Sequence, residues 1–375
     1  MAEPLKTFFS HALVRRLAAD IQRVAPAFSS RAFVRRATTG LDELELLDRG
    51  KHIARALSAH LPEDYPQAIE VLLRSLGPEH ATDELLGLGM APFYYLPHTI
   101  FVAERGLDHF ELSLQAQYEL TKRFSAESSI RAYIAHDPER TFAQLKLWVT
   151  DKNAHVRRLV SEGTRLRLPW ASRVPWLDAN PKRVLALLEL LKDDPTTLVR
   201  RSVANNLNDL SKVHSELTVE TCRDWLRGAS AENKALVHHA LRTLVKKGHR
   251  GALELLGAGA RPRVEIEKVR LSAKSLRIGG ELRFAFSIAS TARDAQKLVV
   301  DYSVHFVKSG GTSRPKVFKL KRITLEAKGA ERLEGKVSFA QMTTRRHYPG
   351  RHRIELLVNG VAFPLGEFMV RPASS

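Results

Sequence analysis

Apolar residues recur at three- and four-residue intervals along most of the chain, from residue 5 to about residue 255. This spacing places apolar side chains on one face of an α-helix, and it predicts a long series of amphipathic helices. Breaks such as Asp137-Pro138, Asn180-Pro181 and Asp194-Pro195 interrupt the pattern, because proline does not continue a helix. The first two thirds of the chain are therefore predicted to be helical.

The period changes after the stretch GAGARPR at residues 257–263. Apolar and polar residues then alternate, as in LRFAFSIAS, LVVDYSVHFV and RHRIELLV, and glycine-containing turns separate these stretches. Seven or eight short strands in about 113 residues are typical of an immunoglobulin-like β-sandwich. We therefore predict a mainly α protein of two domains, a helical domain at 1–262 and an all-β, Ig-like sandwich at 263–375.

The helical part contains an internal repeat. TDKNAHVRRLVSEG begins at residue 150, KDDPTTLVRRSVANNL at 192 and ASAENKALVHHALRTL at 229, so that Val156, Val199 and Val237 are 43 and 38 residues apart. These intervals are typical of the helical pairs of HEAT repeats. We predict a HEAT-like α-helical solenoid, in which equivalent helices stack in parallel and equivalent positions share one face.

The polar face of the repeated helix is cationic and almost free of acids. In the first repeat, Arg158, Glu162 and Arg165 lie opposite the apolar arc. The matching positions are Arg201, Asn205 and Asn208 in the second repeat, with Asp209 beside them, and His239, Thr243 and Lys246 in the third. Such a face suits a phosphate backbone, which Glu162 and Asp209 would repel. An exposed ion pair between Arg158 and Glu162, worth about 0.3–0.5 kcal/mol, is the simplest explanation of that acid.

The charge of the chain favours a polyanionic partner. The formal net charge is +18 and the pI is about 10.1. The excess is uneven, because residues 1–127 have a net charge of −3, residues 128–262 of +9 and residues 263–375 of +12. This distribution is expected of a protein whose later helices and sandwich face phosphate groups, so a nucleic acid is the leading partner.

Other features narrow the possible functions. Cys222 is the only cysteine, which excludes a disulfide framework and a cysteine-based zinc site and fits a reducing compartment. The N-terminal segment lacks the apolar core of a signal peptide, and no run of 18 apolar residues occurs. Neither an HExxH motif nor a P-loop is present. We expect a monomeric, cytoplasmic bacterial protein with no metal, no cofactor and no membrane partner.

A carboxylate in a nucleic-acid groove can also serve catalysis. Hydrolysis of an N-glycosidic bond passes through an oxocarbenium-like cation, which a fixed carboxylate stabilises while it orients the attacking water. Arginines would hold the flanking phosphates, and Trp170, which follows Leu168-Pro169, would offer an aromatic face to a cationic base. A core tryptophan at repeat spacing explains Trp170 equally well.

Several stretches carry a family resemblance: MAEPLKTFF, GLDELELLDRGKHIARAL, LPEDYPQAIEVLLRSLGP, VRRLVSEGTRLRLPW, VRRSVANNLNDLSK and the basic C-terminal module. Together they resemble the bacterial DNA alkylation-repair glycosylases built from HEAT-like repeats, and specifically the AlkC branch. The resemblance implies a monofunctional 3-methyladenine DNA glycosylase that also acts on 3-methylcytosine in double-stranded DNA. It further implies that the cationic base leaves without protonation by a general acid and without conventional base flipping.

The resemblance also implies roles for single residues. Glu162 matches the catalytic carboxylate, Trp170 the aromatic contact to the lesion, and Arg158 an arginine that faces DNA and supports the acid. Asp209 and Glu127 match further active-site acids. The sister AlkD branch has an aromatic residue and an aspartate where this chain reads ESSIRAY at 127–133, which favours AlkC chemistry. From the residues alone, Glu127 is simply an acid at a helix start.

The predicted DNA-binding residues are Arg158, Arg165, Arg201, Asn205 and Lys246 on the helices, and Arg345, Arg346 and His347 in the sandwich turn QMTTRRHYPGRH. The loop KSGGTSRPK adds Lys308, Arg314 and Lys316. Charge that serves only solubility is the alternative for both loops. For the whole chain, the alternative is a HEAT-repeat scaffold that binds nucleic acid or an acidic protein without catalysis. A pure binder has no reason to keep acids on a cationic face, so we prefer the glycosylase.

Overall fold

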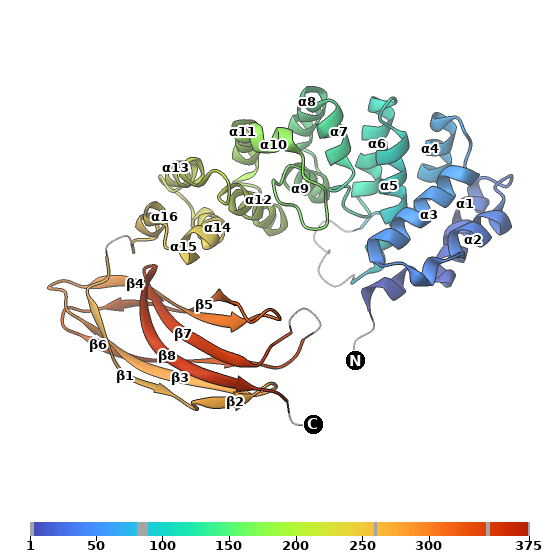
Figure 1. Ribbon diagram of the computed structural model, residues 1–375. Coiled ribbons are helices and arrows are strands. Elements are labelled where there is room, and N and C mark those ends of the chain that lie inside the picture. The colour runs from blue at the N-terminus through green and yellow to red at the C-terminus, as the bar shows by residue number, and fades with distance from the viewer. Residues whose placement is uncertain (1–3, 81–88, 259–260, 343–345, 374–375) are drawn as a thin grey trace. The chain divides into compact units, whose positions relative to one another are not determined.

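The computed structural model describes residues 4–80, 89–258, 261–342 and 346–373. The chain forms two compact units, one of Met1–His214 with Gly228–Ala240 and one of Ser215–Arg227 with Leu241–Ser375. Helices build the first unit, and a β-sandwich forms most of the second (Figure 1). The predicted fold class, a helical solenoid followed by an all-β domain, is confirmed.

The first unit is a row of helices that follow one another along the chain (Figure 1). Its α-helices are α1 His11–Val24, α2 Ser30–Thr38, α3 Leu46–His60, α4 Tyr65–Arg74, α5 Leu96–Arg105, α6 Phe110–Thr121, α7 Ile130–His136, α8 Pro138–Trp148, α9 Ala154–Gly163, α10 Pro175–Ala179, α11 Pro181–Leu191, α12 Thr197–Leu210 and α14 Ala231–Ala240. Single 3₁₀ turns occur at Leu5–Phe8, Leu41–Glu43 and Ala91–Tyr95.

The three helices of the sequence repeat pack on one another in order. α12 lies against α9 on one side and against α14 on the other. The apolar positions of the repeat hold this stack together, because Val156, Val199 and Val237 are fully buried. The N-cap residue Asn153 fixes the start of α9 by accepting a hydrogen bond from the His155 amide at 2.9 Å. The stack brings the ends of α9 and α12 together.

Gly163 ends α9 and allows a close approach to α7. A Cβ atom at this position would lie 2.5 Å from Cγ2 of Ile130, which is fully buried. A β-branched side chain in a packed core has little freedom to move aside. The last turn of α9 therefore sits close to the first residue of α7.

The third repeat differs from the first two. α14 ends at Ala240, and a separate short helix, α15 Arg242–Lys246, follows and belongs to the second unit. Val237, Leu241 and Leu244 keep helical spacing through the break, so the pattern gives no sign of it. Thr243 and Lys246 were predicted to continue the polar face of the third repeated helix, but they lie on α15, a separate helix.

The second unit contains α13 Ser215–Trp225, α15, α16 Arg250–Leu255 and the strands β1 Val264–Leu271, β2 Ser275–Arg277, β3 Glu281–Ser290, β4 Gln296–Val307, β5 Ser313–Leu325, β6 Ala330–Ser338, β7 Gly350–Val358 and β8 Val361–Arg371. Eight strands thus occur within the described residues, in agreement with the expected seven or eight. The change from helix to strand falls between Leu255 and Val264, whereas the compact units divide at earlier residues.

Two sheets form the sandwich. One has the strand order β1-β3-β6 and the other the order β2-β8-β7-β4-β5, and all pairs except β2 with β8 are antiparallel. Alternate residues of β3 point inward, so Phe284, Phe286 and Ile288 are buried. They form one core with inward residues of the other sheet, including Val304 and Ile354.

Two glycines join the short terminal helices to the sandwich. A Cβ atom on Gly360, in the turn between β7 and β8, would lie 2.3 Å from Cα of Gly248, which follows α15. Only two residues without side chains allow the main chains to approach this closely. α15 and the β7–β8 turn are therefore in direct main-chain contact.

We expect Gly163→Ala to reduce the free energy of unfolding by about 1–3 kcal/mol, because the added methyl group overpacks the contact with Ile130. Urea unfolding followed by circular dichroism measures the loss. Gly310→Ala is the control, since a Cβ atom there meets nothing within 4 Å. Equal stability of the two variants would contradict the close packing of α9 on α7.

Candidate active site

Glu162 lies in the last turn of α9 and is buried. Only 4% of the residue is exposed, so the expected ion pair with Arg158 is present, at 3.6 Å, but it is buried and not exposed. Its helix runs alongside α12, whose last turn carries Asp209, with 1% exposed. Two acids from consecutive repeats are therefore withdrawn from solvent at the same end of the helical stack.

A chain of alternating charges connects these acids. The ion pairs are Glu127 Oε2 to Arg158 Nη2 at 3.2 Å, Arg158 Nη2 to Glu162 Oε1 at 3.6 Å, Glu162 Oε2 to Arg165 Nη1 at 2.9 Å, Arg165 Nε to Asp209 Oδ2 at 2.7 Å and Asp209 Oδ1 to Lys212 Nζ at 2.7 Å. We call this set the acidic cluster. It brings together all three predicted acids and both arginines predicted beside them.

Arg165 is the centre of the acidic cluster, because one guanidinium group donates hydrogen bonds to both Glu162 and Asp209. Burial disfavours its charged form, but the charges of the two carboxylates and their hydrogen bonds outweigh burial and raise the pKa of Arg165. The guanidinium is therefore permanently cationic. One fixed cation thus lies between two buried carboxylates.

Glu127 joins the cluster from another element. It lies in the segment that leads into α7, it is partly exposed, and its Oε2 atom accepts a hydrogen bond from the Ser125 hydroxyl at 2.8 Å. Its second contact is the ion pair with Arg158. Glu127 is thus the most accessible acid of the three, and it is not merely an acid at a helix start.

Trp170 is at the surface. It lies in the loop at residues 164–174, between α9 and α10, and 65% of it is exposed. The interpretation as a core tryptophan is therefore wrong. Its φ angle of 63° is left-handed, which is uncommon for a bulky residue. The ring contacts Phe93 edge-on, with 6.4 Å between ring centroids, and it remains open to a ligand.

A groove between α12 and α14 is lined by Arg201, which was predicted to bind DNA, and by His239, which contacts the predicted DNA-binding residue Asn205. Arg201 is exposed and lines this groove, of about 440 Å³, together with Arg200 and His239. Asn205 is half-buried, and its side-chain oxygen lies 3.0 Å from Nε2 of His239. Lys246 is exposed but lies on α15, in the second unit.

The predicted residues of the sandwich have different environments. Arg346 is exposed, whereas His347 is 5% exposed and its ring packs on Phe306 and Phe339. The prediction of His347 as an exposed loop residue is corrected, because the ring fills part of the sandwich core. Arg345 lies outside the described residues. Lys308 is exposed in the loop between β4 and β5, and Arg314 and Lys316 are exposed at the start of β5.

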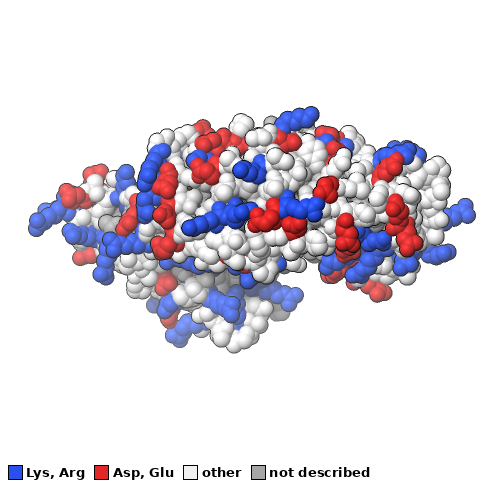
Figure 2. All heavy atoms as spheres, turned by 90° about the horizontal axis from the view of Figure 1, so that it is seen from above, with Lys and Arg blue, Asp and Glu red and all other residues white. Residues whose placement is uncertain are grey.

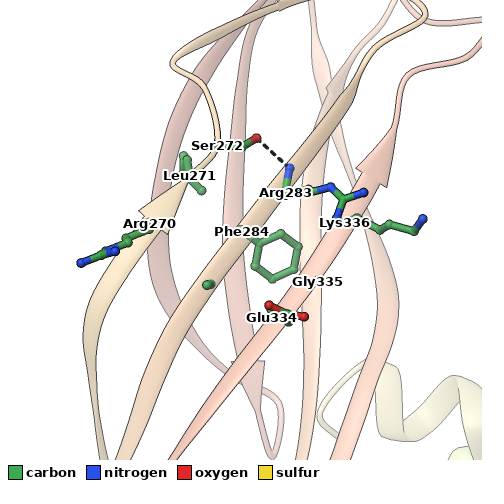
Figure 3. Close-up of a pocket in the computed structure, with 9 residues that line it drawn as sticks. Arg270, Leu271, Ser272, Arg283, Phe284, Glu334, Gly335 and Lys336 are labelled. Atoms are coloured by element: carbon green, nitrogen blue, oxygen red, sulfur yellow. Dashed lines mark hydrogen bonds between the residues drawn. The ribbon is translucent and has the colours of Figure 1, made fainter.

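The sandwich also has a cavity of about 490 Å³ on its three-stranded sheet (Figure 3). Arg270, Arg283 and Lys336 line it together with Glu334. Its basic rim can accept an anion. It lacks the paired buried carboxylates of the acidic cluster, so we place the candidate active site in the first unit.

Cations do not cover every face of the protein. In Figure 2 the visible lysines and arginines alternate with aspartates and glutamates. The net charge of +18 is therefore not concentrated on this face. Among the residues that the structure describes, no group of three His, Cys, Asp or Glu side chains is arranged to hold a metal ion, and no helix is long and apolar enough to cross a membrane.

Three further residues around the site were missed by sequence analysis. Lys212 pairs with Asp209, Arg131 binds the main chain of the 164–174 loop, and Asn206 binds the end of α9. Lys212 had a signal, because it follows Asp209 by three residues in a helical segment. The sequence gives no signal for Arg131 and Asn206, because their partners are main-chain groups or residues that are distant in sequence.

Comparison with known proteins assigns the family. Residues 265–372 match the family described as YhaZ, C-terminal Ig-like domain, so the sandwich is Ig-like. The chain is 35% identical over 362 residues to the uncharacterized protein YhaZ of Bacillus subtilis strain 168, covering 95% of this chain and 96% of that protein. It is 37% identical to the alkylpurine DNA glycosylase AlkC of Pseudomonas fluorescens, solved bound to DNA containing an abasic site analog, with a TM-score of 0.89. That match covers 98% of this chain and 100% of AlkC.

The fold and the comparisons together define a helical solenoid protein with a C-terminal Ig-like domain. Within that class, the chain belongs to the family of AlkC and YhaZ. The resemblance to the AlkC branch is confirmed over nearly the whole chain.

We expect Arg165→Met to reduce the free energy of unfolding by about 3–5 kcal/mol at neutral pH, because Glu162 and Asp209 then lose a shared buried cation. Arg183→Met is the control, because its ion pair with Glu139 is exposed and contributes less than about 1 kcal/mol. Urea unfolding of both variants measures the difference; equal losses in Arg165→Met and Arg183→Met would contradict the electrostatic explanation.

Proposed function

We propose that this protein is a DNA glycosylase that hydrolyses the N-glycosidic bond of cationic alkylated bases in double-stranded DNA. The observation that carries the proposal is the acidic cluster, in which two arginines hold three carboxylates. The loop that follows Glu162 along the chain carries the exposed Trp170. AlkC, which the chain matches over 98% of its length, is an alkylpurine DNA glycosylase. The proposed substrates are 3-methyladenine and 3-methylcytosine.

The carboxylates supply negative charge at the sugar. As the bond to the base breaks, positive charge develops at the anomeric carbon, and a fixed anion stabilises it more strongly away from bulk water. Glu162 is buried and fixed by Arg158 and Arg165, so it needs little reorganisation during the reaction. In this proposal Glu162 stabilises the cation, and Asp209 and Glu127 orient the attacking water.

The leaving base requires no proton donor. A methyl group on the ring nitrogen makes the base a cation, which departs as a neutral molecule. The described cluster accordingly consists of acids whose charge is stabilised by Arg158, Arg165 and Lys212. The protein thus acts as a monofunctional glycosylase: the base leaves with the electrons of the broken bond, and water adds to the sugar cation and releases a proton to solvent.

Trp170 is proposed to contact the lesion. A cationic base is attracted to the face of an aromatic ring, and an indole is the best aromatic partner. With 65% of the residue exposed, the ring can meet a base that has not been swung into a deep pocket. This arrangement supports excision without conventional base flipping.

DNA binding is proposed for the cations around the cluster and on the sandwich. Arg201 and Arg200 line the α12–α14 groove, and the second half of the helical part and the sandwich carry the excess positive charge. We further propose that the helical row is of HEAT type and that the protein works as a monomer at the bacterial nucleoid. We propose that the functional domains meet between residues 262 and 263. We also propose DNA contacts for Arg158, Arg165, Asn205, Lys246 and Arg346.

One observation favours a second function, a DNA-binding scaffold without catalysis. Both oxygens of Glu162 already have an arginine within 3.6 Å, as a purely structural network would require. The two functions differ in one product. Incubation of the protein with methylated DNA, followed by chromatography of the released bases, supports the glycosylase if 3-methyladenine appears and supports the scaffold if no base is freed.

We expect Glu162→Gln to slow base release by at least roughly 100-fold, since it removes the charge that stabilises the transition state. DNA affinity should stay equal or increase, because the variant has one anion fewer near phosphate. Asp194→Asn is the matched control: Asp194 is a buried carboxylate bonded to Arg157 at 2.6 and 3.0 Å, outside the cluster, and its replacement should not change the rate. Wild-type rates in Glu162→Gln would remove the catalytic assignment.

We expect combined Lys308→Gln, Arg314→Gln and Lys316→Gln to weaken DNA binding and flatten its salt dependence. Removing one cation that pairs with a phosphate lowers the slope of log affinity against log salt concentration by about 0.9. Fluorescence anisotropy at several salt concentrations measures the slope. The control combines Lys51→Gln and Arg74→Gln, which replace exposed cations in the acidic first part of the chain. Equal slopes in both sets would return the sandwich loop to a role in solubility.

A further inference from the structure

A buried arginine lies under the loop that carries Trp170. Arg131, in α7, is 4% exposed. Its Nη1 atom donates hydrogen bonds to the carbonyl oxygens of Gly163 at 3.0 Å and Arg165 at 2.7 Å, and its Nε atom donates to the carbonyl oxygen of Ser172 at 3.0 Å. One side chain thus contacts both ends of the 164–174 loop.

The partners of Arg131 are unusual for a buried charge. Within the described part of the chain it forms no ion pair, and all three of its acceptors are main-chain carbonyl groups. Burial lowers the pKa of Arg131 to about 10, so the guanidinium stays charged at neutral pH. A buried cation without a carboxylate is costly to the fold, and an apolar residue would fill the same space more cheaply. Its benefit is therefore the geometry that it imposes on the loop.

A guanidinium group suits this task. It is planar and its donors have fixed directions, so the acceptors around it must take fixed relative positions. Gly163 directly follows Glu162, and Ser172 lies two residues after Trp170. Through these two carbonyls, Arg131 links the main chain beside the acid to the main chain beside the tryptophan.

The end of α9 is fixed from the other side as well. The Asn206 amide of α12 donates to the Ser161 carbonyl at 2.8 Å and to the Thr164 hydroxyl at 3.0 Å. The acid is therefore held independently of Arg131. At the far end of the loop Arg131 holds the Ser172 carbonyl, and Trp170, two residues earlier, keeps a left-handed main chain that persists only when its surroundings enforce it.

We infer that Arg131 is a positioning residue that sets the indole of Trp170 at a fixed place relative to Glu162. Its hydrogen bonds reach the main chain on either side of these two residues, so it acts through the main chain of the 164–174 loop. The inference rests on the proposed function. In that function Arg131 influences the rate at which a bound lesion reacts, and it does not influence the affinity for DNA. Arg131→Met removes all three hydrogen bonds, and Arg131→Lys keeps the charge but loses the planar fork.

The first measurement is independent of activity. The full-length protein is labelled with 5-fluorotryptophan, and the resonance of Trp170 among the four tryptophans is assigned with Trp170→Phe. We expect the Trp170 resonance to shift or broaden in Arg131→Met and in Arg131→Lys. Arg157→Met is the control, because Arg157 is a partly buried arginine whose hydrogen bonds reach Asp194 and the Asp151 carbonyl instead of the loop. An unchanged Trp170 resonance, or an equal change in Arg157→Met, overturns the inference.

The second measurement separates reaction from binding. Under single-turnover conditions with DNA containing 3-methyladenine, we expect Arg131→Met to react on the order of 100-fold more slowly, as for a catalytic group misplaced by about 1 Å. Arg131→Lys should retain intermediate activity, and both variants should bind the DNA as wild type does. Reaction rates equal to that of Arg157→Met overturn the inference. If wild type frees no base, the proposed function fails, and the fluorine spectra still decide the role of Arg131.

Discussion

The shared contact of Glu162 and Asp209 with the Arg165 guanidinium is the interaction on which the site depends. Two carboxylates that are almost fully buried would repel each other and lose their hydration, and one cation between them offsets both effects. This contact requires the last turns of α9 and α12 to lie side by side. The stacking of repeats supplies that arrangement, because α12 packs against α9 and carries Asp209 one turn beyond Asn205, the position equivalent to Glu162.

Rigidity follows from how the cluster is built. Its acids come from the segment before α7, from α9 and from α12, and each is held by a cation from another position in the chain. A solvated carboxylate would have to reorganise its water when positive charge forms nearby. An acid that is already fixed in a dry site needs no such reorganisation, which is the main advantage of a preorganised electrostatic environment. Arg131 and Asn206 extend the same fixation to the main chain around Glu162.

Much of the fold and part of the site could be predicted from the sequence. The change from helical to alternating periodicity located the two kinds of structure, and the phase of the repeat placed Arg158, Glu162 and Arg165 together. Periodicity could not reveal that Glu162 is buried, because a helical position opposite the core is normally exposed and only the neighbouring repeat covers it. It could not find the break after Ala240, where apolar spacing continues, nor the burial of His347 in a basic turn. Arg131 has main-chain partners, which leave no trace in the identity of side chains.

The contact between Gly248 and Gly360 bears on how such proteins could be divided or recombined. The Ig-like family match begins at residue 265, but the main chain after α15 is fitted against the β7–β8 turn. A sandwich that begins at Val264 would lack Gly248, so the main chain of the β7–β8 turn at Gly360 would lose this packing contact. A chimaera joined at Leu241, where the longer segment of the second unit begins, would inherit both glycines from a single parent.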